Sequence, residues 1–203
     1  MASVVAPYLP HERLRAVADS FLKEHHPSGE LPVPIEEIIE FDFGLDIVPM
    51  PGLKSEFDVD AFITSALSEI RVDGDIYSNR PNRYRFSLAH ELAHLLIHQD
   101  VFKAMKFTTI REWKAAICSI PERQYFFIEQ QAYTLAGLIL VPKSPLVSLF
   151  QESAEKANAA GLDIQELDPK FRRSIESSIG RHFDVSADVV ARRLKSEKLW
   201  SHS

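Results

Sequence analysis

Residues 85–98 read RFSLAHELAHLLIH and place histidines at intervals of four, with a glutamate directly after the first. On a helix, residues four apart lie on one face with Cβ atoms about 6 Å apart, so His90 and His94 can direct ring nitrogens at one ion. Imidazole nitrogens bind zinc at roughly 2.0–2.1 Å. Glu91 lies one residue round the helix, where its carboxylate can take a proton from a water at that ion. The stretch therefore predicts a helical metal site with Glu91 as the base.

Two other side chains near this motif fit a metal ligand less well. His98 lies eight residues beyond His90, about 12 Å along an unbroken helix, which is too far for both to hold one ion. We therefore expect a supporting or purely structural role for His98. Asp100 follows His94 by six residues, but the turn that would bring it to the ion needs glycine where the sequence has Ile97. The third ligand is expected elsewhere in the chain.

The composition is typical of a folded globular domain, with 45% hydrophobic and 26% charged residues in a chain of 203. The single Cys118 excludes an intramolecular disulfide. No stretch approaches the ~20 apolar residues that a membrane span requires. Residues 1–14 lack the basic start and apolar run of a signal peptide. We therefore expect a cytoplasmic protein that does not associate with membranes.

The charge is distributed unevenly along the chain. The net charge is -6, yet residues 170–198 contain eight Lys or Arg against four Asp or Glu, which gives +4 there and -10 elsewhere. A basic face suits an acidic partner or nucleic acid, but a solvated helix surface is the simpler interpretation. An acidic protein as a whole is a poor match for the phosphate backbone, so we expect no direct DNA binding.

Hydrophobic spacing and turn residues predict an α+β protein, with a small antiparallel sheet before the histidine helix and a mainly helical C-terminal half. Strands are expected at 44–51 and within 60–78, where Asp73-Gly74 is a hairpin signal. Asn82 is expected to cap the histidine helix. The other expected helices are Glu12–His25, Pro34–Phe41, Ile110–Cys118, Glu122–Leu140, Ser144–Ala159, Pro169–His182 and Ala187–Leu199.

The helix expected at 122–140 offers a third ligand. Glu129 lies beside Ala132 and Ala136, and such small residues would let this helix pack closely against the histidine helix. Two imidazoles and one carboxylate leave a position open for water, as catalytic zinc sites do. If Glu129 is not the ligand, Glu122 or Asp100 is the next candidate.

Two stretches of the sequence resemble the ImmA/IrrE family of zinc metallopeptidases. The first is residues 85–98, with its His-Glu-x-x-His motif. The second, EQQAYTLAGLILVP at 129–142, is similar to the family's Glu-x-x-Ala-x-x-Phe-Ala-x-x-Leu-Leu-Met-Pro element. Leu135 replaces the usual Phe and Val141 the usual Met, which are both apolar exchanges. Weaker similarity covers most of residues 30–200, apart from 100–124.

The resemblance implies a zincin-like metallopeptidase fold that binds Zn2+ through His90, His94 and Glu129, with Glu91 as the catalytic base. It also implies a protein substrate, a helix-turn-helix transcriptional repressor whose cleavage relieves repression of stress-response or mobile-element genes. We expect a short, peptidase-only form. Its peptidase domain would occupy residues 1–165, and a helical segment at 166–203 would pack on the same domain.

Hydrolysis also needs a donor for the oxyanion and a surface for the peptide. Residues 75–78, expected as a strand, could supply an edge for an extended substrate. The candidate oxyanion or supporting groups are Tyr133, His98, Arg85 and His182.

Two alternatives to a peptidase remain open from the sequence. The first is a catalytically silent binding or sensor protein with an occluded cleft, in which residues 100–124, with Phe102, Phe107 and Trp113, form a lid or docking surface. The second is a DNA-binding regulator, because SIGRHFDVSADVVARRL at 178–194 weakly resembles a helix-turn-helix.

Overall fold

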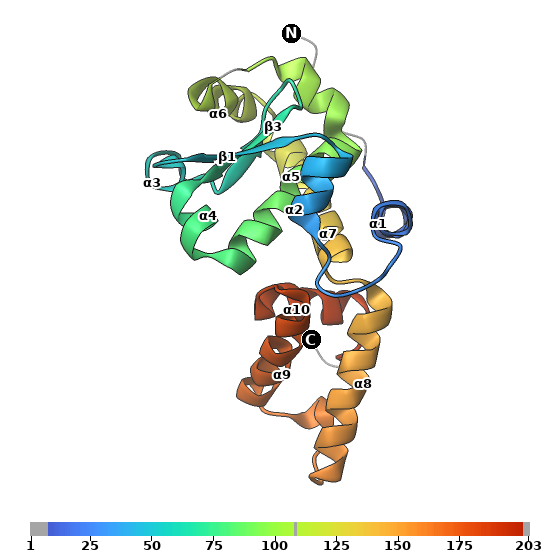
Figure 1. The fold of residues 1–203 in the computed structure, drawn as a ribbon. Helices are drawn as coiled ribbons and strands as arrows, with labels where there is room; N and C mark the ends of the chain where they lie inside the picture. Colours follow the sequence, from blue (N-terminus) through green and yellow to red (C-terminus); the bar gives the residue numbers. More distant parts are fainter. Residues whose placement is uncertain (1–7, 108, 201–203) are drawn as a thin grey trace.

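In the computed structural model, which describes residues 8–107 and 109–200, a three-stranded sheet packs beside two long helices, and a group of helices lies below them (Figure 1). The expected α+β class is confirmed. The first seven residues of the stretch tested for a signal peptide lie outside the described ranges. The N-terminal elements are helix α1 (His11–His25), helix α2 (Ile35–Glu37) and a π-helical turn η1 (Ile38–Asp42).

The sheet is mixed, so the expectation of a purely antiparallel sheet was wrong. Strand β3 (Glu69–Asp73) lies between β1 (Asp46–Met50) and β2 (Ala61–Ile63), parallel to the first and antiparallel to the second. The chain reverses between β1 and β2 through the short helix α3 (Leu53–Phe57), and again before β3. Because β3 inserts between the two earlier strands, its direction matches that of β1.

Asp73-Gly74 starts a helix instead of turning a hairpin. The Asp73 side chain accepts hydrogen bonds from the backbone N–H of Asp75 at 3.0 Å and of Ile76 at 3.2 Å, which caps helix α4 (Gly74–Asn79). Asp is as good an N-cap as a turn residue, and here capping prevails. The hairpin turn lies at residues 64–68. The edge expected at 75–78 is therefore helical, and β2 is the edge strand on the cleft side.

The histidine helix α5 (Pro81–Met105) crosses helix α7 (Glu122–Leu140), and the two form the centre of the upper part of the molecule (Figure 1). Asn82 does not cap α5. Arg80 is the N-cap residue and Pro81 occupies the first turn, where its missing N–H costs nothing. The helix is interrupted at His98, whose backbone has φ -127° and ψ 16°.

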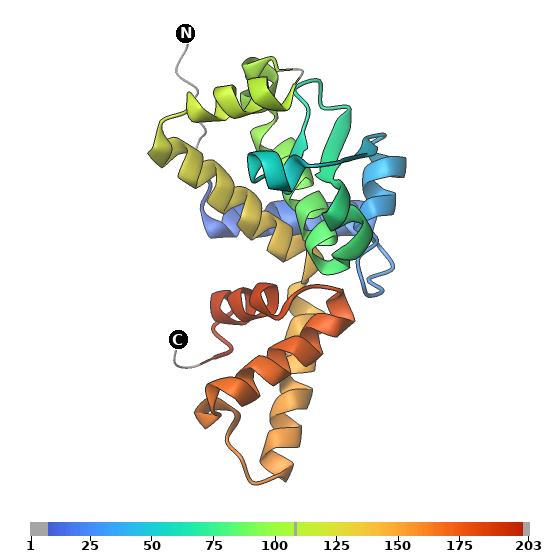
Figure 2. The same ribbon diagram turned by 90° about the vertical axis from the view of Figure 1, so that its left-hand side faces the viewer.

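The C-terminal helices match the expected positions closely, and α7 and α6 (Ile110–Cys118) have the expected bounds. Helix α8 runs down from the end of α7, and α9 and α10 pack beside it (Figures 1 and 2). The expected domain boundary at 165/166 falls within a 3-10 turn, and the division remains a prediction. The bounds of these elements are α8 Lys143–Ala159, η2 Ile164–Glu166, α9 Pro169–Phe183 and α10 Ala187–Ser196.

Buried ion pairs attach α10 to the upper part of the molecule. The Arg193 side chain is 5% exposed and donates from Nε to the Val141 carbonyl at 3.1 Å and from Nη1 to Glu197 at 2.8 Å. Arg15 of α1 donates to the same carboxylate at 2.5 Å. These contacts join three helices and fix where the neighbouring residues of α10 lie.

Within the described part of the chain, none of the individual helices has the length and apolar character of a membrane span. Only α7 and α8 taken together have the length and composition of a membrane span, and the chain is bent by 68° at their junction.

The close approach of α9 and α10 gives a stability prediction. A Cβ at Gly180 would lie 2.7 Å from the Val185 carbonyl oxygen, whereas one at Gly137 would meet Arg193 Cδ at 3.4 Å. We expect Gly180→Ala to lower the free energy of unfolding by about 1–3 kcal/mol through overpacking. The matched Gly137→Ala should be neutral or slightly stabilising, because alanine favours the helix by about 0.5–1 kcal/mol. Urea unfolding of both variants checks this, and equal midpoints would contradict it.

Candidate metal centre

Three side chains from α5 and α7 converge on one point. His90 Nε2 lies 3.1 Å from His94 Nε2 and 3.1 Å from Glu129 Oε2, and His94 Nε2 lies 3.5 Å from Glu129 Oε1. Ligand atoms placed tetrahedrally at 2.0–2.1 Å from a zinc ion are about 3.4 Å apart. The three donors are therefore already spaced as such an ion requires, and the residues fit a metal of this class.

Two of the three donors, Glu129 and His94, also have suitable protonation states. Burial raises the pKa of Glu129, but the adjacent His90 and His94 imidazoles outweigh it and hold that pKa below its usual range. Burial lowers the pKa of His94. An anionic carboxylate and a neutral imidazole are the forms that bind a metal ion.

His98 and Gln131 determine which ring nitrogen of His94 is free to bind a metal. The Gln131 Oε1 atom can only accept, so His98 Nε2, 3.1 Å away, carries the proton. His98 Nδ1 is then an acceptor, and His94 Nδ1, 3.1 Å away, must donate to it. This leaves His94 Nε2 with a free lone pair toward His90 and Glu129. His98 thus lies behind the donor set and not within it.

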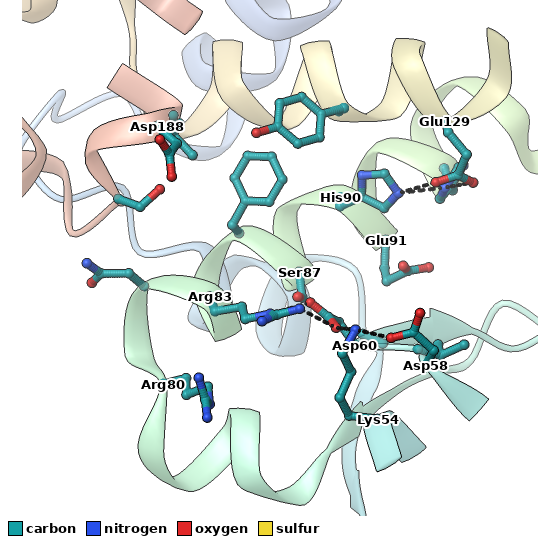
Figure 3. Close-up of a pocket in the computed structure, with 18 of the residues that line it drawn as sticks. Lys54, Asp58, Asp60, Arg80, Arg83, Ser87, His90, Glu91, Glu129 and Asp188 are labelled. Atoms are coloured by element: carbon teal, nitrogen blue, oxygen red, sulfur yellow. Dashed lines mark hydrogen bonds and ion pairs between the residues drawn. The ribbon is translucent and has the colours of Figure 1, made fainter. Parts of the chain in front are cut away.

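Glu91 lies beside the donor set but is held by a different partner. Its carboxylate is within 4.8 Å of ligand atoms of His90 and His94, and it is farther from them than Glu129 is. Its Oε2 accepts a hydrogen bond from the Ile63 N–H of β2 at 2.9 Å. Burial raises the pKa of Glu91 to about 8. The two carboxylates therefore have different environments, one paired with imidazoles and one with the backbone of β2. Figure 3 shows Glu129 joined to His90, with Glu91 apart from that pair.

A cavity of about 920 Å³ opens over these groups. Asp188 of α10 lies at the end away from Glu129, and a cluster with Asp60 and Arg83 lies along the lower side (Figure 3). Another part of the lining is apolar and aromatic, and much of it comes from the segment 100–124, for which the sequence showed no resemblance to the family. Its lining residues include Phe102, Trp113, Ile117 and Tyr125.

The structure brings only part of the expected supporting set to the cavity. Tyr133 lines it, one helical turn beyond Glu129. His98 is buried behind His94. Arg85 donates to the Val33 carbonyl at 2.7 Å and does not line the cavity, and His182 is exposed on α9, also away from it.

Sequence reasoning missed Tyr125, which lines the cavity one turn before Glu129. Burial and the carboxylates of Glu129 and Glu91 raise the pKa of Tyr125, so its hydroxyl remains protonated and able to donate. Its position four residues before Glu129 was the available signal, because residues at that spacing share a helix face.

The fold and the donor set are those of a metallopeptidase-type domain, and the comparisons agree. Residues 76–195 match the model of a peptidase family described as the IrrE N-terminal-like domain. The chain belongs to this family, which confirms the resemblance seen in the sequence. No curated protein matches the chain.

Among solved structures, a Mycobacterium tuberculosis transcriptional regulator is similar, with a TM-score of 0.53 and 18% sequence identity. The similarity covers 90% of this chain and 46% of that one, so this chain spans about half of that protein's length. At this identity the likeness concerns the fold alone.

Removing the carboxylate from the donor set should abolish metal binding. We expect Glu129→Ala to lose the zinc that the wild type binds at about one ion per chain, because two imidazoles alone hold it too weakly. Metal content after zinc reconstitution and desalting measures this. Glu122→Ala is the matched control, since Glu122 is exposed on the same helix and does not line the cavity. Unchanged zinc in Glu129→Ala would assign the third ligand elsewhere.

Removing the His98 hydrogen bond should weaken metal binding without abolishing it. His98→Leu keeps a side chain of similar volume but frees the His94 ring to rotate or change tautomer. Loss of such a partner typically lowers metal affinity about 10–100-fold. Competition with a fluorescent zinc chelator measures the change, and thermal unfolding of the metal-free form separates it from a folding defect. An unchanged zinc affinity would limit His98 to packing.

Proposed function

We propose that this protein is a zinc-dependent endopeptidase that hydrolyses a peptide bond in a protein substrate. The observation that carries the proposal is the convergence of His90, His94 and Glu129, with the separate carboxylate of Glu91 beside them, under an open cavity. Membership of a peptidase family supports the same reaction class. A silent binding protein with an occluded cleft receives no support, because Trp113 and Ile117 line the cavity without filling it.

In the proposed mechanism, His90, His94 and Glu129 hold the metal. A zinc ion bound there would supply Lewis acidity for a water and for the scissile carbonyl. Glu91, fixed by the Ile63 N–H, accepts the proton of the attacking water and returns one to the leaving amine. Tyr125 and Tyr133 line the same cavity, and their hydroxyls are candidates to donate to the oxyanion.

The outer edge of β2 is the proposed surface for the peptide backbone. Phe62 and Arg71 of β3 form a hydrogen-bonded pair. Hydrogen-bonded and non-hydrogen-bonded pairs alternate along an antiparallel ladder, so the backbone N–H and C=O groups of the neighbouring Ala61 and Ile63 point away from β3. Glu91 takes the Ile63 N–H, and Ala61 lines the cavity. An extended peptide can therefore pair with the backbone of Ala61 and lie across the donor set.

The proposed substrate is a helix-turn-helix transcriptional repressor, as the resemblance to ImmA/IrrE peptidases implies, and its cleavage would relieve repression. The arrangement of α10 supports action on a protein and not on DNA. Arg193 is buried in ion pairs, and Arg192 lies over the Tyr133 ring at the cavity. Arg193 is therefore not presented on an outer helix face, as a recognition helix would require. Arg192 is exposed, but its guanidinium lies against the lining of the cavity.

Loss of the proposed base should separate metal binding from catalysis. We expect Glu91→Gln to retain about one zinc per chain and to cleave about 10²–10⁴-fold more slowly, because its amide cannot take a proton. The assay is incubation with casein and with a helix-turn-helix repressor encoded by a neighbouring gene, followed by mass spectrometry of the fragments. Glu122→Gln is the matched control and should cleave as the wild type does. Cleavage at the wild-type rate by Glu91→Gln would exclude Glu91 as the base.

A further inference from the structure

The basic side chains that line the cavity differ in whether they have a carboxylate partner. Lys54, Arg80 and Arg83 each form an ion pair with an aspartate, at 2.6, 2.8 and 2.5 Å respectively. Arg192 also lines the cavity, and within residues 8–107 and 109–200 no carboxylate oxygen lies within ion-pair distance of it. Asp188, one turn earlier on α10, is engaged by Arg173 at 2.7 Å. Arg192 is therefore the cavity cation whose charge is not neutralised by a direct partner.

Arg192 is nevertheless held in place. Its guanidinium carbon lies 4.4 Å from the centroid of the Tyr133 ring, and Tyr133 in turn contacts the Phe86 ring at 4.7 Å. The neighbouring Arg193 anchors this part of α10 through its buried contacts. A guanidinium stacked on an aromatic face keeps its edge N–H groups available, and that edge suits a carboxylate.

The Arg192 stack lies one helical turn from the metal donors. Tyr133 follows Glu129 by four residues on α7, and Phe86 precedes His90 by four on α5, which is a displacement of about 6 Å along each helix. An extended peptide advances about 3.3 Å per residue. A substrate side chain that meets Arg192 is therefore about two residues from the bond over the donors.

We propose that Arg192, stacked on Tyr133, is an anion-binding subsite that selects peptides with an Asp or Glu about two residues from the scissile bond. The inference rests on the proposed peptidase function, which it deepens by naming a feature of the substrate. The ligand is a side-chain carboxylate, which an arginine edge binds through two parallel hydrogen bonds.

The cleavage specificity of the enzyme tests the subsite. Wild type, Arg192→Gln and Arg192→Glu are incubated with a synthetic peptide library, and the cleaved bonds are read by mass spectrometry. We expect the wild type to favour Asp or Glu at one position by about tenfold. Arg192→Gln should lose this preference, and Arg192→Glu should favour Lys or Arg at the same position. Arg181→Gln, which removes an exposed charge of α9 outside the cavity, should keep the wild-type profile. An acidic preference that is absent or unchanged in all variants overturns the proposal.

A binding experiment tests the same subsite without any cleavage. Zinc-loaded, 15N-labelled Glu91→Gln protein is titrated with the capped pentapeptide Ala-Ala-Asp-Ala-Ala or its Asn analogue at millimolar concentration. We expect the Asp peptide to shift the side-chain Nε–H resonance of Arg192 and to bind about tenfold more tightly than the Asn peptide. When the Arg192→Gln substitution is introduced into the same Glu91→Gln protein, the two peptides should bind equally.

The two proposals fail in distinguishable ways. If the Asp preference depends on Arg192 but the wild type cleaves nothing, the anion subsite stands and the peptidase function fails. If both peptides bind equally, or neither shifts the Arg192 resonance, the subsite is overturned whether or not the protein cleaves.

Discussion

The close packing of α5 against α7 brings groups from two helices to within 3.5 Å of one another, and the proposed chemistry depends on that approach. Small residues make it possible. Ala89 and Ala93 of α5, and Ala132 and Ala136 of α7, are all 0% exposed. A larger side chain at one of these positions would push the helices apart, since a packed core cannot absorb extra methylenes without a backbone shift. The Glu129 carboxylate would then no longer reach the histidines.

At this contact between α5 and α7, the surroundings of Glu129 and Glu91 give the two carboxylates different chemical properties. Glu129 lies beside two imidazoles, which stabilise its anion and suit it to bind a metal. Glu91 is buried with one backbone N–H as its partner, so it is more basic and available to carry a proton. The contrast follows a general pattern in which neighbouring carboxyl groups take separate tasks because their surroundings separate their pKa values.

The local patterns of the sequence predicted the helices well, and they predicted that His90, His94 and Glu129 lie close together. The positions of His90, His94 and Glu129 depend on helix geometry and on the contact between α5 and α7. Small and apolar residues at helical spacing indicate both in the sequence. The strand order was not predictable in the same way, because no sequence pattern around β1 indicates that β3 inserts beside it. Asp73-Gly74 was misjudged because Asp both turns and caps, and tertiary context decides between them. The role of Arg192 at the cavity was also not predictable, since its neighbour Tyr133 is 59 residues away in the sequence.

The attachment of α10 by Arg193, Glu197 and Arg15 has an evolutionary consequence. The groups proposed for hydrolysis lie on α5 and α7, whereas Arg192, which lines the cavity, is carried by α10, a helix that is joined to them through a few buried contacts. Substitutions on the exposed face of α10 therefore leave the hydrolytic groups untouched. Duplicated copies of such a domain can diverge in the partners they bind while each inherits the same proposed hydrolytic groups intact.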